Sequence, residues 1–142
     1  MRLRRPFQFS IAALLAIVAL SALAANWYAG HRRAVLANMA AEHDYLGAKS
    51  SYEVGTALPD TVYSTSVAWL KATLAVPLGD RASAYADHLE RMRSLESKER
   101  SFLASGSWGE SMFHGGLERR IANATAWREE AEKWAATGVV LP

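Results

Sequence analysis

The chain has 142 residues, with 16 lysines and arginines, 14 aspartates and glutamates, and no cysteine. The absence of cysteine excludes disulfide bonds, thiol nucleophiles and cysteine-ligated metal sites. Three arginines precede Pro6, so residues 31–142 hold 13 basic and 14 acidic side chains, a net charge near −1. The overall positive charge is therefore a property of the N-terminal segment, and no nucleic-acid partner is expected.

An uncharged, mostly apolar stretch follows a short basic segment, residues 1–6. From Pro6 to Gly30 there are 25 residues without a charge. A helix of that length reaches roughly 37 Å, and about 20 apolar residues cross a bilayer core. Residues 7–30 are therefore predicted to be a transmembrane signal anchor, which ends in two aromatic residues suited to the interface. Its expected membrane-contacting side chains are Phe9, Ile11, Leu14, Leu15, Ile17, Val18, Leu20, Leu23, Trp27 and Tyr28.

The charges on either side of this segment predict its orientation. Arg2, Arg4 and Arg5 precede it, and Arg32 and Arg33 follow it. The positive-inside rule then favours a single-pass protein of a bacterial inner membrane, with the N-terminus in the cytoplasm and the C-terminal domain in the periplasm or outside.

A cleaved secretory signal peptide is the alternative to an anchor. It has the same basic, apolar and small-residue regions, and Ala22-Leu23-Ala24 fits an A-x-A cleavage site. Cleavage there would release a secreted helical domain. Against it, the apolar run continues past that site to aromatic residues and a basic stop.

Residues 31–137 predict an all-α, antiparallel bundle of two helix-turn-helix hairpins, followed by a tail at residues 138–142. Alanine is abundant and β-branched residues are sparse, which favours helix over sheet. The expected helices are about 31–54, which continues the anchor, 59–76, 81–105 and 108–137. Their ends are marked by glycines in αL positions, by Pro at N1 and by N-cap residues. The marking residues are Gly55, Pro59, Asp80, Gly106, Ser107 and Glu110.

Each expected helix carries a stripe of apolar residues at three- and four-residue spacings, as in bundles and coiled coils. On the first helix, one face has Leu36, Met39, His43, Leu46 and Ser50. A shift of 51 residues also superposes the two glycine turns, which indicates a weak internal repeat of hairpins. The stripes of the other three helices contain Val62, Ser66, Trp69, Leu70, Thr73 and Leu74; Ala82, Tyr85, Leu89, Met92, Leu95 and Phe102; and Phe113, Leu117, Ile121, Ala124, Trp127, Ala131 and Trp134.

Three motifs carry a resemblance to a group of proteins. Arginines precede Phe7-Gln8-Phe9-Ser10, the turn Tyr52-Glu53-Val54-Gly55 follows, and a charged run extends from His88 to Glu96. Together these resemble uncharacterised small single-anchor bacterial proteins with helical-hairpin repeats, a resemblance that implies an anchor and no assigned activity. The turns are also similar to the hairpins of outer-membrane efflux proteins; Asp60 approximates their acidic position, and Ser111 departs from it.

No pattern of catalytic or metal-binding residues stands out. The four histidines, His31, His43, His88 and His114, form no close metal pair, and we expect His43 and His88 at helix surfaces or boundaries. Convergence of those two with a carboxylate would make a zinc site. The carboxylates cluster beside basic residues, as on a solvated face. They are Glu96, Glu99, Glu129, Glu130 and Glu132.

The sequence therefore predicts no cofactor, and it favours a non-enzymatic accessory, tether or scaffold that acts through protein contacts or self-association of its helices. Three tryptophans, Trp69, Trp127 and Trp134, fit core stripes, whereas Trp108 beside a glycine turn is the candidate partner contact. A ligand-binding or sensory bundle is the alternative. An enzyme built on histidine and carboxylate is a third hypothesis.

Overall fold

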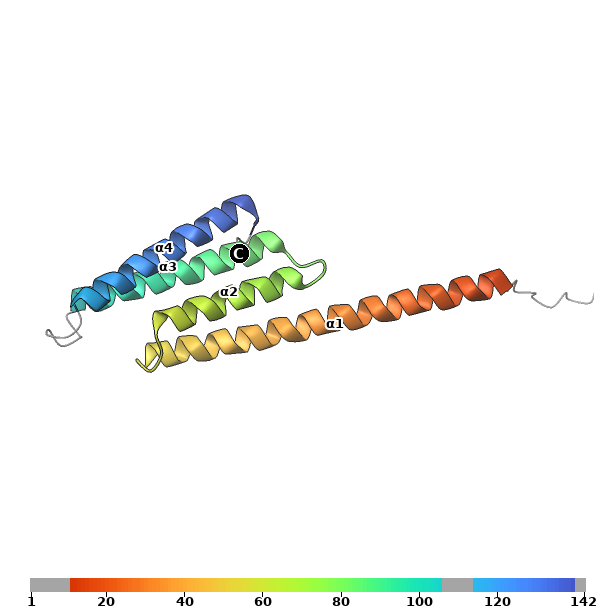
Figure 1. Ribbon diagram of the computed structural model, residues 1–142, viewed down its shortest axis with the longest axis horizontal. Helices are drawn as coiled ribbons and strands as arrows, with labels where there is room; N and C mark the ends of the chain where they lie inside the picture. Colours follow the sequence, from red (N-terminus) through yellow and green to blue (C-terminus); the bar gives the residue numbers. More distant parts are fainter. Residues whose placement is uncertain (1–10, 106–113, 140–142) are drawn as a thin grey trace, which may run out of the picture. The chain divides into compact units, whose positions relative to one another are not determined.

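In the computed structural model, residues 11–105 and 114–139 are described. They form four helices and no strand: α1 (Ile11–Glu53), α2 (Pro59–Ala75), α3 (Arg81–Ser105) and α4 (His114–Thr137) (Figure 1). The predicted all-α class is confirmed. The chain divides into two compact units, residues 1–33 and 34–142, and α1 contributes residues to both.

The described part of the first unit is the apolar half of α1. Among the described residues, α1 is the one helix that is long and apolar enough to cross a membrane, and none of its apolar stretch is buried. Leu15, Leu20 and Leu23 each expose about two-thirds of their surface. Near the end of the unit the rings of Trp27 and His31 stack at 5.5 Å. A secretory signal sequence shares this length and composition.

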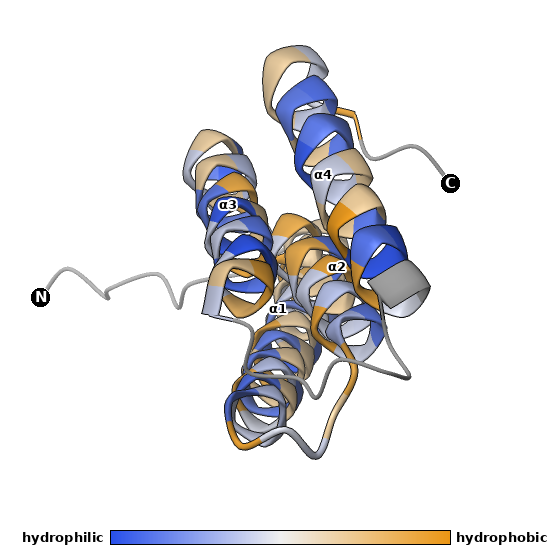
Figure 2. Ribbon diagram, turned by 90° about the vertical axis from the view of Figure 1, so that its left-hand side faces the viewer, coloured by the Kyte–Doolittle hydropathy of each residue, from blue (hydrophilic) through white to orange (hydrophobic). Residues whose placement is uncertain are grey.

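In the second unit, consecutive helices run antiparallel. Near the start of α3, the Tyr85 hydroxyl donates to the carbonyl of Gly138, the residue after α4, at 2.7 Å. Near the end of α3, Glu99 accepts from Arg120 in the first part of α4, at 2.8 Å. Figure 1 shows α3 and α4 side by side, with α2 next to α3. Figure 2 also shows hydrophilic and hydrophobic residues alternating along α3 and α4, as expected for amphipathic helices.

The helix ends follow the local signals in the sequence. Gly55 has φ +78°, which glycine adopts without strain, and it closes α1. Pro59 is buried at the start of α2, and the Ser83 amide donates to Asp80 Oδ1 at 3.1 Å, a cap for α3. In the turn before this cap, Leu78 is the residue with positive φ (65°), and its side chain is 95% exposed.

The core of the second unit consists of two clusters, and it includes most of the apolar stripes expected on α2, α3 and α4. One cluster joins α1, α2 and α3, and the other joins α2, α3 and α4. Ala82 is the one described member of those three stripes that is exposed. The buried members are Tyr45, Tyr52, Val62 and Leu95 in the first cluster, and Leu70, Ala84, Tyr85 and Trp134 in the second.

The stripe expected to pack from the first helix was assigned to the wrong face. Leu36, Met39 and Leu46 are 55%, 60% and 51% exposed, and His43 and Ser50 are exposed with them. The opposite face packs instead, through Tyr45 and Tyr52. Contacts with distant helices hold this face inward, since Tyr52 donates to Glu99 of α3 and Tyr45 packs on the ring of Trp69 of α2.

Several predicted features lie outside the described residues. These are the first anchor residue and the N-terminal arginines, and the second glycine turn with its capping box and its tryptophan. The residues concerned are Arg2, Arg4, Arg5, Phe9, Gly106, Ser107, Trp108 and Glu110.

Candidate functional site

A buried carboxylate on α3 links three helices. Glu99 is fully buried, and its Oε1 accepts hydrogen bonds from the Tyr52 hydroxyl (2.6 Å) and from Arg120 Nη2 (2.8 Å). Its Oε2 has no hydrogen-bond partner among the described residues. Burial, and then the hydrogen bond to Glu99, raise the pKa of Tyr52 well above its usual value. The prediction that Glu99 lies on a solvated face was wrong, because tyrosine and arginine from distant helices cover it.

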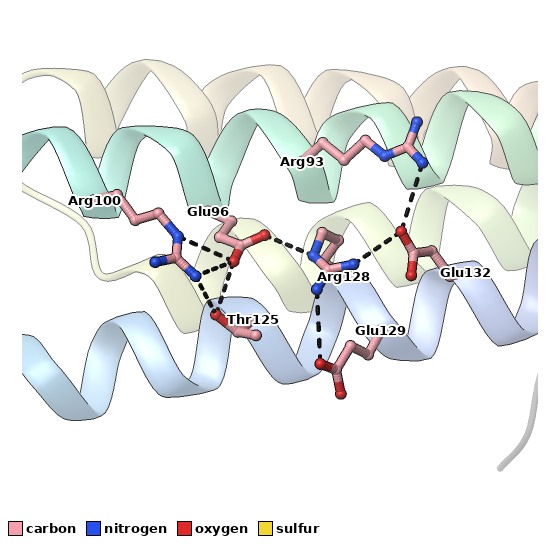
Figure 3. Close-up of polar contacts among 7 residues, drawn as sticks. All are labelled: Arg93, Glu96, Arg100, Thr125, Arg128, Glu129 and Glu132. Atoms are coloured by element: carbon pink, nitrogen blue, oxygen red, sulfur yellow. Dashed lines mark hydrogen bonds and ion pairs between the residues drawn. The ribbon is translucent and has the colours of Figure 1, made fainter.

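One turn earlier, Glu96 forms the centre of an ionic network between α3 and α4. Its two oxygens accept from Arg100, Thr125 and Arg128, all between 2.7 and 3.1 Å (Figure 3). Burial works to raise the pKa of Glu96, but the bonds from Arg100 and Thr125 and the charge of Arg128 outweigh it and lower the pKa. The network continues from Arg128 to Glu132, at 2.8 Å. It holds two helices together along their edge.

A second buried polar centre contains a serine and a histidine. Ser66 Oγ lies 2.9 Å from His88 Nδ1, and Arg91 Nε donates to Ser66 Oγ at 2.8 Å. The imidazole stacks on Trp134 at 5.5 Å. The serine oxygen thus accepts from the arginine and shares a further hydrogen bond with the imidazole, whose direction follows the tautomer of His88. Burial, and then the charge of Arg91, lower the pKa of His88 to about 4. This histidine is therefore neutral at pH 7.

The distance between Ser66 and His88 is that of a nucleophile and its general base in a hydrolase, but the pair shares nothing else with such a site. A nucleophile must reach its substrate, and both side chains are fully buried with no exposed surface. The pair is a hydrogen bond within the core that joins two buried polar side chains. The prediction of a surface or boundary position for His88 was wrong, since Trp134 and Ser66 enclose it.

The two histidines do not form a metal site. His43 lies on the exposed face of α1, whereas His88 is fully buried. No group of three or more potential ligand residues comes together in the part of the chain that the structure describes. Trp69 and Trp127 pack against the core as expected, and Trp69 also receives the Arg91 guanidinium over its ring at 4.2 Å.

A cavity of about 650 Å³ opens beside the Glu99 centre. Tyr52 and Arg120 belong to both features, and Phe102 and Leu117 supply apolar walls. Glu99 itself is buried behind them. A cavity of this size with mixed walls suits a mainly apolar ligand that carries one polar group. Its remaining lining residues are Glu53, Val54, Gly55, Ala57, Leu58 and Gly116.

Sequence reasoning missed both buried polar centres and this cavity. The available signal was Tyr52 and Ser66, polar residues at inward positions of their helices, but their partners are 47 and 22 residues away in the sequence. Of the sites that were predicted, the described anchor residues are exposed and apolar, Gly55 lies in the turn before α2, and Pro59 begins α2. No family model, no curated protein and no solved structure matches the chain.

Proposed function

We propose that this chain is a membrane-anchored, non-enzymatic protein whose helical unit acts through contacts with another protein chain. The observation that carries the proposal is the distribution of exposed apolar surface. It lies along the first half of α1, suited to lipid, and along the outer face of the second half, where Leu36, Met39 and Leu46 are more than half exposed. Large exposed apolar patches on water-facing domains mark interaction sites.

The buried polar groups support a structural role for α3. Glu99 and His88 are both fully buried and hydrogen-bonded to side chains of other helices. A catalytic acid or base must instead meet its substrate. Their arrangement stabilises one packing of the helices, and this is what a scaffold or tether requires.

The orientation that we propose places the N-terminus in the cytoplasm and the helical unit outside a bacterial inner membrane. The motive is the excess of arginine before the apolar stretch. A cleaved signal would instead make the unit a secreted protein, with the same exposed stripe on α1.

Intact mass and protease accessibility of the chain in washed bacterial membranes test this proposal. The expected result is a full-length mass in the membrane fraction and a C-terminal unit digested only from the periplasmic side. Arginines at Leu15 and Leu20 should abolish retention, because each costs about 3 kcal/mol in the bilayer centre. Arginine at Leu36, beyond the apolar stretch, is the matched control and should leave retention unchanged. A soluble chain with a mass starting near Ala25 would overturn the anchor.

Ligand binding is a second candidate function, and the cavity beside the Glu99 centre favours it. Its walls include Phe102, Leu117 and Arg120, so an apolar body has a binding wall and a polar group has a hydrogen-bond donor nearby. The dye 8-anilinonaphthalene-1-sulfonate, which is aromatic and anionic, fits this chemistry. We expect saturable fluorescence enhancement that Ala57→Trp removes by filling the cavity. An equal enhancement with Ala57→Trp would exclude the site.

A further inference from the structure

The turn between α2 and α3 presents a leucine that is almost completely exposed. Leu78 lies between Pro77 and Gly79, and 95% of its surface is exposed, more than for any other large apolar residue that the structure describes. Its φ of +65° lies in the left-handed region, which glycine and asparagine adopt more readily than leucine does. Neither packing within the unit nor the backbone of the turn therefore favours leucine at this position.

A hydrogen bond identifies the end of the second unit at which this turn lies. Thr73 Oγ1, near the end of α2, donates to Asn38 Oδ1 of α1 at 2.7 Å. Leu78 comes five residues after Thr73, and Ala34, the first residue of the unit, comes four residues before Asn38. Because α1 and α2 are antiparallel, both steps lead to the same end of the unit. This end, which carries Ala34 and Leu78, is here called the proximal end.

The residues after α4 reach the proximal end as well. Tyr85, in the second turn of α3, donates to the Gly138 carbonyl at 2.7 Å. The next residue, Val139, is 53% exposed. Figure 1 shows the turn between α2 and α3 and the end of α4 on the same side of the unit. The proximal end therefore has two exposed apolar side chains, which come from segments far apart in the sequence.

The length of chain before Ala34 keeps the proximal end close to the bilayer. The predicted anchor ends at Gly30, and four residues of fully extended chain span at most about 14 Å. This limit holds for any conformation of residues 31–33. The headgroup layer adds roughly 5–7 Å on each side of the hydrocarbon core. By contrast, Leu58 lies in the turn at the opposite end, which α1 places roughly 29 Å from Ala34.

We propose that Leu78 and Val139 insert into the interface of the membrane that holds the anchor, so that the proximal end binds a lipid surface. The inference rests on the membrane anchor of the proposed function and adds a lipid contact to its protein contact. Two small apolar side chains would hold a soluble protein on a membrane only weakly. Because the anchor already confines the chain to the bilayer, the second contact forms at a high effective concentration.

The charges at the proximal end suit an anionic headgroup layer. From the last turns of α2 to the first turn of α3, the charged residues are Lys71, Asp80 and Arg81, all exposed. Residues 34–41 carry no charge, and residues 132–139 carry one of each sign. The basic residues thus exceed the acidic ones by one, so an anionic lipid surface attracts this end.

Quenching by a spin-labelled lipid measures the contact directly, since the chain has no cysteine of its own. Leu78→Cys and Val139→Cys carry a nitrobenzofurazan dye, and the purified full chain is reconstituted at a low protein-to-lipid ratio. The vesicles consist of phosphatidylcholine and phosphatidylglycerol with a lipid spin-labelled near its headgroup. Leu58→Cys is the control, because this leucine is 63% exposed in the turn at the opposite end. We expect at least about threefold more quenching at residues 78 and 139 than at residue 58. Equal quenching at the three positions, or none at any, would overturn the proposal.

Asparagine substitutions test the role of the leucine without disturbing the fold. With the dye at residue 139, Leu78→Asn should lower the quenching about threefold, and Leu58→Asn should leave it unchanged. Neither should lower the unfolding midpoint, because asparagine tolerates the positive φ at residue 78 and is a preferred N-cap at residue 58. Unchanged quenching with Leu78→Asn would exclude Leu78 from the contact.

The outcomes for the anchor and for the lipid contact are distinguishable. A chain that stays in the soluble fraction with a shortened mass overturns the anchor and, with it, this inference. A full-length, membrane-embedded chain whose dye at residue 78 is quenched no more than the dye at residue 58 overturns the lipid contact alone. A dye at residue 78 that is shielded from aqueous iodide but not quenched by the lipid would indicate a second copy of the chain instead, and it would also overturn the proposal.

Discussion

Two polar residues of α3, Glu99 and His88, are fully buried, and their surroundings stabilise them in different ways. The Glu99 carboxylate lies between an arginine and a tyrosine, whereas His88 shares one hydrogen bond with a serine and stacks on Trp134. They are about three turns apart on the same helix. A buried charge needs partners of opposite charge, but a buried imidazole can be kept neutral by desolvation alone. The first centre should therefore depend on its partners, and the second on pH.

Removal of the carboxylate should have the largest effect. Glu99→Ala leaves Arg120 and the Tyr52 hydroxyl without their acceptor, and we expect a loss of about 3 kcal/mol in the free energy of unfolding. Urea unfolding of the full chain in detergent, followed by tryptophan fluorescence, measures it. Glu118→Ala on the exposed side of α4 is the control and should change stability by less than about 0.5 kcal/mol. Equal losses in both variants would refute a special role for Glu99.

The histidine centre should make stability depend on pH. The pKa of His88 is lowered to about 4 in the folded chain from an ordinary value of 6.5. The unfolded chain therefore binds more protons between these values, and stability falls as pH drops from about 6.5 to 4, by at most about 3 kcal/mol. His88→Gln should flatten this slope in unfolding measured at pH 7, 6 and 5. A slope that survives the substitution would place its origin elsewhere.

The stability that Glu96 and Glu53 contribute to the fold is also lost on acidification, but at a lower pH than the contribution of His88. The pKa of each is held below its ordinary value of 4.5 by basic partners. A carboxyl with a lowered pKa contributes stability that is present above 4.5 and lost below it. Measurements between pH 5 and 7 therefore isolate the contribution of His88.

Arg91 connects the histidine centre to the aromatic cluster of α1 and α2. Its guanidinium lies over the rings of Trp69 (4.2 Å) and Tyr45 (5.3 Å), and its Nε donates to Ser66. Lysine keeps the charge but not the planar stacking or this hydrogen-bond geometry, so Arg91→Lys should cost about 1–2 kcal/mol. The exposed Arg93→Lys, measured in parallel by urea unfolding, should be close to neutral.

The smallest effect is expected at the surface ion pair between α1 and α3. Lys98 Nζ lies 2.6 Å from Glu53, but the two side chains are 39% and 44% exposed. Exposed pairs contribute about 0.2–1 kcal/mol, and salt screens them. Lys98→Ala should therefore cost less than about 1 kcal/mol, and the loss should shrink in 1 M NaCl. A loss as large as that of Glu99→Ala would contradict the contrast between buried and exposed charge.

Local signals predicted the helices well because each signal acts on its own backbone. Gly55, Pro59 and Asp80 mark ends whose geometry depends on the neighbouring residues alone. The apolar stripes of α2 and α3 were equally clear, since each of those helices has a single apolar side.

The packing of α1 and the buried centres could not be predicted in the same way. Between residues 34 and 53, α1 carries two usable stripes on opposite sides, one with Leu36 and Leu46 and one with Tyr45 and Tyr52. Nothing local decides between them. The burial of Glu99 likewise depends on Tyr52 and Arg120, which only the packing of distant helices brings together. The spacing of residues along the sequence does not indicate the contact of Glu99 with Tyr52 or with Arg120.

The bond from the Tyr85 hydroxyl to the Gly138 carbonyl has a consequence for local opening of the molecule. The last turn of a terminal helix normally frays and exchanges its amide hydrogens with solvent within moments. Here the residue after α4 is tied at 2.7 Å to a buried side chain near the start of α3. The amides of the last turn should therefore exchange only as the α3–α4 hairpin opens as a whole, and Tyr85→Phe should return them to fast exchange.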